Sequence, residues 1–220
     1  MYPTPINFST MTLTFQDLSD RAIRLFEEKK ERVIIGVAGI PGSGKSTVTE
    51  AVGKIINKSH KCVVVGLDGF HYTREYLRSL ENSEEAFIRR GAHFTFDAKS
   101  CVEFVKSLRA RTTISAPSFD HKLKDPVNNG TIIPGEAEIL LVEGLYVLLN
   151  IDPWNQISQY LDDSWFINVD LDVARDRVAK RHVEAGIEPT IEKAYQRVDS
   201  NDIINAHLIM DNSIPANLII

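Results

Sequence analysis

One glycine-rich segment carries the clearest chemical signal in this chain. It reads Gly39-Ile40-Pro41-Gly42-Ser43-Gly44-Lys45-Ser46, is followed by Thr47, and matches the pattern G-x-x-x-x-G-K-[ST]. Glycine adopts positive φ angles without strain, so successive backbone N–H groups can turn toward one anion. Lys45 adds a flexible positive charge for terminal phosphates, and Ser46 offers a hydroxyl to Mg²⁺. We therefore predict that nucleotide phosphates bind to Gly39, Gly42, Ser43, Gly44, Lys45, Ser46 and Thr47.

The surroundings of this segment favour a phosphate-binding loop over a glycine-rich turn that binds nothing. The apolar run Val33–Ala38, which has the length of a strand, precedes it, and a helical pattern begins at Lys45. A loop between a buried strand and a helix directs the positive end of the helix dipole toward the anion. The dinucleotide pattern G-x-G-x-x-G is not met, because Gly42 and Gly44 are followed by Thr47. ATP therefore fits this loop better than NAD does.

Two acidic residues each follow an apolar run of strand length. Asp68 follows Val63–Leu67, and Glu143 follows Ile139–Val142. Ligands of open α/β sheets bind beyond the carboxyl ends of the strands. Phosphoryl transfer to an alcohol needs Mg²⁺ near the phosphates and a carboxylate that orients the hydroxyl and takes its proton. We expect Asp68 and Glu143 to divide these two duties between them, with Ser46 beside the metal. The residues alone leave open which acid is the base and which acts on the metal, and they also allow acids that merely cap helices or pair with lysines.

The elements that must position these side chains alternate along the chain as in βαβ units. We expect a P-loop NTPase-type three-layer α/β/α fold with a mostly parallel sheet and a small helical lid. Short helices are expected at 74–80 and 83–90, and a polar loop at 117–129. The other expected strands are 33–38, 62–67, 113–116, 138–142, 165–169 and 217–220, and the other expected helices are 15–30, 45–57, 98–108, 172–185 (capped by Asp172) and 191–200.

Composition limits the classes of function. The 220 residues suit one domain, which we place at 14–220 after a loose tail at 1–13. The net charge of −5 argues against a protein that coats nucleic acid. Cys62 and Cys101 lack the spacing of a zinc site or a disulfide framework. No apolar run approaches the length that spans a membrane, and no signal peptide or presequence precedes the domain, so the cytoplasm is the expected location.

The motifs of this chain occur in a familiar order. Asp68-Gly69-Phe70-His71, Arg89-Arg90-Gly91, the run 116–121 (Ala-Pro-Ser-Phe-Asp-His) and Leu141-Val142-Glu143-Gly144-Leu145 follow the phosphate loop. This combination resembles the phosphoribulokinase/uridine kinase family, which includes bacterial-type pantothenate kinase. The resemblance implies a kinase that transfers the γ-phosphate of ATP to an alcohol of a small metabolite, with Asp68 as base and Glu143 acting on Mg²⁺. The Asp-Gly-Phe-His segment is nearer to the pantothenate kinase pattern than to the Asp-Ser-Phe-Tyr of uridine kinase.

Further residues are expected at the two ends of the site. Arg177 and Arg181 share one face of the helix after the 165–169 strand, where the family has its lid, so we place an arginine lid within about 172–190. The alternative is a solvated helix face. We expect the acceptor to contact His71, Tyr72, Arg90, Phe119 and His121.

Two functions remain open on these grounds. The first is a kinase for a pantothenate-like acid, a nucleoside, a sugar or a sugar phosphate. The second is a regulator or assembly factor that hydrolyses ATP and has no small-molecule acceptor. The sequence lacks the Asn-Lys-x-Asp segment that reads guanine, which favours a kinase over a GTP switch. The oligomeric state is open, with a homodimer among the alternatives.

Overall fold

The fold is described from a computed structural model covering residues 13–120 and 123–220. The predicted tail therefore lies almost wholly outside the described residues. The helices are α1 Phe15–Lys29, α2 Lys45–Ile56, α3 Arg74–Ser79, α4 Ser83–Ile88, α5 Ala98–Ser107, α6 Leu171–Glu184, α7 Ile191–Arg197 and α8 Ile203–Asn212. The strands are β1 Val33–Gly39, β2 Cys62–Gly66, β3 Ile114–Asp120, β4 Asp125–Ile133, β5 Ile139–Glu143, β6 Asp163–Ile167 and β7 Leu218–Ile219.

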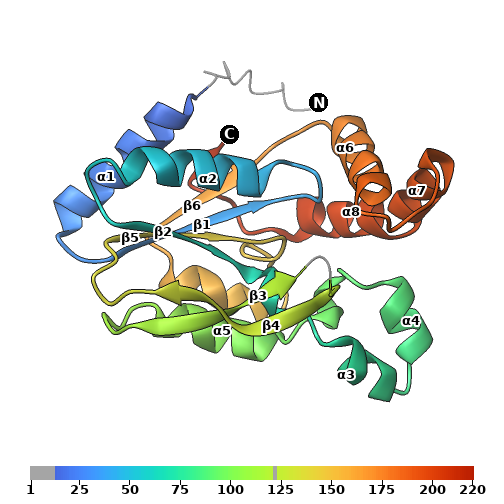
Figure 1. Cartoon of the computed structure of the whole chain (residues 1–220). Coiled ribbons are helices and arrows are strands. Elements are labelled where there is room, and N and C mark those ends of the chain that lie inside the picture. Colours follow the sequence, from blue (N-terminus) through green and yellow to red (C-terminus); the bar gives the residue numbers. More distant parts are fainter. Residues whose placement is uncertain (1–12, 121–122) are drawn as a thin grey trace, which may run out of the picture.

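A five-stranded parallel sheet in the order β2-β5-β1-β6-β7 forms the centre of the molecule (Figure 1). Glu143, the last residue of β5, pairs in register with Val37 of β1 on one side and with Gly66 of β2 on the other. Because all five strands run the same way, their carboxyl ends meet at one edge. The phosphate loop after β1, Asp68 after β2 and Glu143 on β5 are therefore neighbours. The predicted three-layer α/β fold is confirmed.

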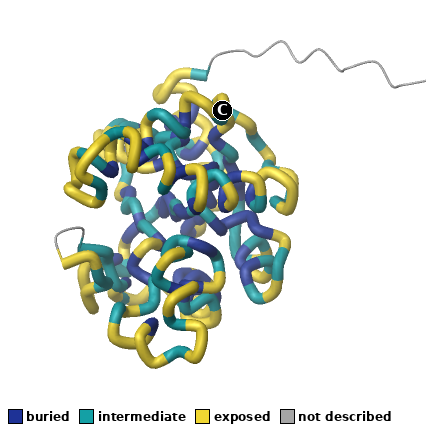
Figure 2. The backbone as a smooth tube through the Cα atoms, turned by 90° about the vertical axis from the view of Figure 1, so that its right-hand side faces the viewer, coloured by how far each residue is buried: buried dark blue, intermediate teal, exposed yellow. Residues whose placement is uncertain are grey.

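Helices cover both faces of the sheet, as the continuous apolar run of β1 requires. Every residue of β1 is buried. Ile35 and Val37 pack in one core cluster with Leu18 of α1 and Val52 of α2. The alternate residues Ile34 and Ala38 belong to the cluster on the opposite face, which α5 and the 3₁₀ segment Trp154–Tyr160 help to form. Figure 1 shows α1 and α2 on one side of the sheet and α5 on the other, and Figure 2 shows the buried residues gathered in the interior.

A buried arginine, Arg32, directly before β1, connects the start of this strand to neighbouring segments through hydrogen bonds. The Arg32 side chain donates to five backbone carbonyls at 2.8–2.9 Å, those of Leu108, Ala110, Pro134, Gly135 and Ala137. Arg32 is 3% exposed. The guanidinium of Arg32 therefore links the start of β1 to the end of α5 and to the segment after β4.

The expected polar loop at 117–129 is wrong. Instead, β3 and β4 form an antiparallel hairpin whose pairing places Ser118 opposite Val127 and Phe119 opposite Pro126. The register shifts between Ala116 and Ser118, so Pro117 lies at an irregularity where its missing N–H is tolerated. β3 packs against the 3₁₀ turn Leu67–Phe70, so the hairpin contacts the turn that carries Asp68.

Two expectations about the C-terminal helices also need correction. The cap of α6 is Asp170, whose carboxylate accepts from the N–H groups of Asp172 and Val173, and not Asp172. The helix expected to end near residue 200 continues through a π turn, Val198–Asp202, into α8. A π turn adds a residue to the helical repeat without ending it, so the polar run Asp199-Ser200-Asn201-Asp202 does not stop the helix. None of the described helices combines the length and the apolar character needed to cross a membrane.

Candidate active site

The glycine-rich loop joins β1 to α2 with the backbone conformation that its sequence predicts. Gly42 and Gly44 have φ angles of 78° and 96°, a region that other residues rarely adopt. A Cβ on Gly42 would lie 2.4 Å from the carbonyl oxygen of Ala174 on α6, whereas a Cβ on Gly44 would meet nothing within 4 Å. Gly42 thus lets α6 approach the loop, and Gly44, which caps α2, faces open space.

A cavity of about 340 Å³ opens above this loop at the carboxyl edge of the sheet. Residues of the loop, of the ends of β2 and β5 and of α6 line it. The residues predicted from the sequence that line it are Gly42, Gly44, Lys45, Ser46, Thr47, Asp68, His71, Glu143, Arg177 and Arg181. Pro41, Gly91, Leu145 and Asp202 complete the lining.

Lys45 is buried at the floor of the cavity. Its Nζ donates to the carbonyl oxygens of Gly39 and Ile40, each at 3.0 Å. Burial lowers the pKa of Lys45 to about 8, although the carboxylates of Glu143 and Asp68 oppose this shift. An incoming phosphate would favour the charged ammonium and raise the pKa again.

Ser46 and Glu143 form the oxygen pair that the sequence assigns to a metal. The Ser46 hydroxyl donates to Glu143 Oε1 at 3.1 Å. Burial and the Asp68 carboxylate raise the pKa of Glu143, whereas Lys45 and the Ser46 hydrogen bond oppose the shift. A hydroxyl and one carboxylate suit Mg²⁺, which is commonly held by one or two protein oxygens together with phosphates and water. Within 13–120 and 123–220, no three His, Cys, Asp or Glu side chains gather as a metal cage.

An orphaned polar atom supports an anion at the loop. Ser43 is buried, and its Oγ has no hydrogen-bond partner. Nearly all buried polar groups in proteins have such a partner, so the hydroxyl fits a site completed by a ligand. The unpartnered hydroxyl and the open space at Gly44 both fit a phosphate group bound at the loop.

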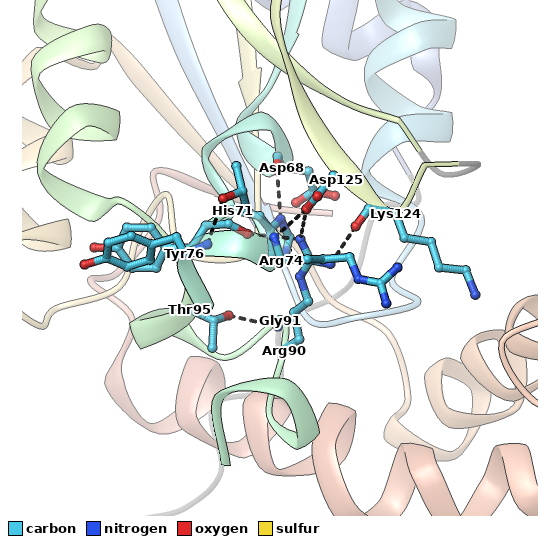
Figure 3. Close-up of polar contacts among 11 residues, drawn as sticks. Asp68, His71, Arg74, Tyr76, Arg90, Gly91, Thr95, Lys124 and Asp125 are labelled. Atoms are coloured by element: carbon cyan, nitrogen blue, oxygen red, sulfur yellow. Dashed lines mark hydrogen bonds and ion pairs between the residues drawn. The ribbon is translucent and has the colours of Figure 1, made fainter. Parts of the chain in front are cut away.

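Asp68 lies on the 3₁₀ turn Leu67–Phe70, directly after β2, and its side chain is exposed to the cavity. The backbone carbonyl of Asp68 lies 2.8 Å from His71 Nδ1, which holds the turn together (Figure 3). The His71 ring stacks against Phe96, with ring centroids 3.8 Å apart, and contacts Phe119 at 5.0 Å. Asp68 is therefore a solvent-accessible carboxylate on a turn fixed by aromatic packing.

Helix α6 presents two arginines to the cavity. Arg177 and Arg181 are both exposed, and Arg177 Nη1 lies 3.4 Å from the carbonyl oxygen of Gly42. Their neighbour Arg175 instead pairs with Asp199 at 2.5 Å and lies over the Tyr195 ring. Arg177 and Arg181 are thus the arginines of this helix that line the cavity, and Arg177 also contacts the phosphate loop.

Three residues predicted to contact the acceptor do not line this cavity. Arg90 does not line the cavity: it donates to Asp125 Oδ1 at 2.8 Å and to the carbonyl oxygens of Tyr72 and Lys124, which ties the hairpin to the Asp68 segment (Figure 3). Tyr72 stacks on Tyr76 and lines a second, more open cavity of about 490 Å³. Phe119 packs between His71 and the Arg90 guanidinium. His121 lies outside the described residues. Gly39 and Ser43 belong to the loop but do not line the cavity.

The lining also includes residues that sequence reasoning missed. Gly91 belongs to the Arg89-Arg90-Gly91 motif, but the motif alone does not assign it a role at the cavity. Asp202 carried no signal, because its side chain reaches the cavity only through the π turn that precedes α8.

Comparisons with known proteins agree with this geometry. The sequence model of the phosphoribulokinase/uridine kinase family matches residues 34–198. A Schizosaccharomyces pombe protein named as a candidate uridine kinase is 38% identical over 213 residues, which cover 94% of this chain and 90% of that protein. An "ATP-dependent kinase-like protein" from Aspergillus versicolor is 41% identical over 154 residues, or 68% of this chain and 90% of that protein.

The fold is shared with solved structures. The crystal structure of a candidate fructose transport system kinase from Silicibacter sp. TM1040 superimposes with a TM-score of 0.86 at 24% identity, covering 94% of this chain and 99% of that chain. At this identity the likeness concerns the fold alone. The family match, the relatives and the phosphate loop agree, and the chain belongs to the phosphoribulokinase/uridine kinase family of P-loop kinases.

Proposed function

We propose that this protein transfers the γ-phosphate of ATP to a hydroxyl of a small metabolite. One observation carries the proposal: a phosphate loop, an Mg²⁺-type oxygen pair, two lid arginines and an exposed carboxylate, Asp68, line the same cavity. A nucleotide switch would need the loop and the metal ligands, but it has no use for a carboxylate that faces an acceptor. The names of two relatives, a candidate uridine kinase and an "ATP-dependent kinase-like protein", support this reading.

The chain's own residues divide the work by position. The loop amides and Lys45 bind the β- and γ-phosphates, and Arg177 and Arg181 stabilise the charge that spreads over the transferring group. Asp68 accepts a hydrogen bond from the acceptor hydroxyl and takes its proton. The acceptor oxygen then forms a bond to the γ-phosphorus, the bond from that phosphorus to the bridging oxygen breaks, and ADP leaves with the electron pair.

Ser46 and Glu143 would hold Mg²⁺, which neutralises phosphate charge when it is bound. If Ser46 and Glu143 hold Mg²⁺, Asp68 is the carboxylate left to act as the base. Glu143 is engaged by the Ser46 hydroxyl and is half-buried, whereas the Asp68 side chain is exposed to the cavity. The carboxylate with room for an acceptor hydroxyl is therefore Asp68.

Kinetics of Asp68→Asn test this function. The amide keeps the shape of the side chain but cannot take a proton, so we expect phosphate transfer to fall by about 10²- to 10⁴-fold while the Kd for ATP changes by less than about threefold. Asp211→Asn, an exposed aspartate on α8, is the matched control.

The wild-type protein should release little ADP until an acceptor is supplied, and mass spectrometry should then detect a metabolite that has gained one phosphate. Full transfer by Asp68→Asn would refute the base assignment. Basal hydrolysis that a partner protein changes, without any phosphorylated metabolite, would instead support an ATP-hydrolysing regulator.

A further inference from the structure

The Arg89-Arg90-Gly91 motif forms a tight turn beside the cavity. The N–H of Ala92 donates to the carbonyl oxygen of Arg89 at 2.8 Å, which closes the turn. Gly91 has a φ of 106°, and a positive φ at the third position of a turn is typical of type II, where it favours glycine. Gly91 lines the cavity, whereas Arg89 and Arg90 do not. The backbone of the motif, rather than its charges, therefore reaches the site.

Hydrogen bonds from several elements fix this turn. The Tyr146 hydroxyl donates to the carbonyl oxygen of Gly91 at 2.6 Å. The N–H of Gly91 donates to Thr95 Oγ1 at 3.0 Å (Figure 3). The buried Asn201 donates to the carbonyl oxygen of Arg90 at 3.0 Å. Both backbone polar groups of Gly91 are thus engaged within the protein, so a bound molecule would meet Gly91 chiefly through its Cα.

The turn and the residues after β5 both adjoin the segment that carries Asp68. The N–H of Tyr72, shortly after Asp68, donates to the carbonyl oxygen of Thr95 at 2.9 Å. A Cβ on Gly144 would lie 3.1 Å from the Cβ of Leu67, the residue before Asp68. These two segments therefore form the cavity wall next to the proposed base.

Two residues of this wall present apolar surface. Gly91 and Leu145 line the cavity together with Asp68 and His71. Among the described residues, no atom outside the turn lies within 4 Å of the position that a Cβ on Gly91 would take. Leu145 is only partly buried, and the next residue, Tyr146, holds the Gly91 carbonyl. The Tyr146 hydroxyl therefore sets the spacing between the two apolar residues.

We propose that Gly91 and Leu145 are specificity-determining residues for the acceptor. The part of the acceptor that does not react packs against their apolar surface while its hydroxyl reaches Asp68, and the bare Cα of Gly91 sets how bulky that part can be. Tyr146 is a positioning residue that holds Gly91 in place. The inference rests on the proposed kinase function and adds to it that the shape of this wall selects the acceptor.

Dilution series of a deproteinised cell extract test this role without knowledge of the acceptor. Each enzyme variant is incubated with Mg²⁺, saturating ATP and the extract at several dilutions, and mass spectrometry follows every metabolite that gains one phosphate. The extract concentration that gives the half-maximal rate serves as a relative acceptor KM, and the ATP KM is measured at a fixed extract concentration.

Substitutions that fill or enlarge the cavity should have opposite effects. Gly91→Ala adds a methyl group at the wall and should raise the relative acceptor KM by about tenfold or more, as expected for one methylene in a close-fitting pocket, with the ATP KM within about twofold. Leu145→Ala should yield phosphorylated products from bulkier metabolites that the wild type leaves unchanged. Leu208→Ala is the matched control, because Leu208 is also partly buried against the same core but does not line the cavity.

Tyr146→Phe tests the positioning role. The variant keeps the ring but loses the donor to the Gly91 carbonyl, so the relative acceptor KM should rise by about three- to tenfold, as for one lost hydrogen bond, and the ATP KM should not change. Tyr160→Phe removes a hydroxyl outside the cavity and is the control. A lower melting temperature without this difference between the two KM values would contradict a role in acceptor binding.

The inference is overturned if the wild type gives products but Gly91→Ala keeps its relative acceptor KM and Leu145→Ala keeps the product set. A lower kcat for every acceptor, with no change in acceptor KM, would mean that Gly91 serves the turn alone, which also overturns it. If Gly91→Ala does not fold because of its positive φ, Leu145→Ala and Tyr146→Phe decide the question. Absence of any phosphorylated product from the wild type would contradict the kinase function itself, so the two failures are distinguishable.

Discussion

The affinity for nucleotide should weaken at alkaline pH because of Lys45. The pKa of this lysine is about 8 in the ligand-free protein, below its ordinary 10.5, with burial as the largest cause. Bound phosphates favour the ammonium and restore a high pKa, so above pH 8 binding must take up a proton. The Kd for ADP then rises about fivefold between pH 8 and pH 9 and approaches about tenfold per unit only at higher pH. Between pH 7 and pH 9 we expect an increase of about tenfold.

Isothermal titration calorimetry with ADP and Mg²⁺ at pH 7, 8 and 9 measures this change. Repeating the titrations in buffers with different ionisation enthalpies counts the protons taken up, and the number should approach one at pH 9. Lys45→Met has no titratable group there, so its weaker affinity should vary little across this range and corrects for ionisation of the nucleotide. Equal values of Kd at pH 7 and pH 9 for the wild type, or the same pH dependence in Lys45→Met, would refute this account of the lysine.

Three further substitutions test the framework around the site. Arg32→Met leaves five buried carbonyls without their donor and should lower the free energy of unfolding by about 4 kcal/mol or more, measured by urea denaturation; a loss under about 1 kcal/mol would contradict the anchoring role. Gly42→Ala strains a positive φ and brings a Cβ against the Ala174 carbonyl, so calorimetry should find both lower stability and weaker nucleotide binding, and an unchanged affinity would argue against the close approach of the lid. Arg177→Ala should lower kcat by about 10²- to 10³-fold in steady-state assays, whereas Lys180→Ala, an exposed residue on the same helix, should not; equal effects would contradict a specific role for Arg177.

Local patterns were sufficient to predict the central sheet and the phosphate loop. β1 is a continuous apolar run because helices cover both of its faces, and that cause is visible in the residues themselves. The glycine spacing before Lys45 likewise reflects backbone angles that glycine tolerates. Asp68 and Glu143 come together because parallel strands end at one edge, a rule that needs no knowledge of side-chain contacts.

Pairing between distant residues explains the predictions that failed. The β3–β4 hairpin contains Pro117, and β4 is largely polar. Neither strand therefore shows the regular alternation of apolar and polar residues that predicts a strand, and the pairing becomes visible only in the structure. Arg90 pairs with Asp125, which lies 35 residues along the chain, so the local sequence does not reveal why Arg90 is absent from the cavity lining. The π turn before α8 shifts which residues share a face, so the position of Asp202 could not be read from helical spacing.

Crystals grown with Mg²⁺ and a nonhydrolysable ATP analogue test the central claim most directly. The account predicts the β- and γ-phosphates on the backbone amides around Gly44, with the Asp68 carboxylate facing the γ-phosphate across the cavity. Phosphates bound elsewhere, or an Asp68 side chain turned away from them, would contradict it.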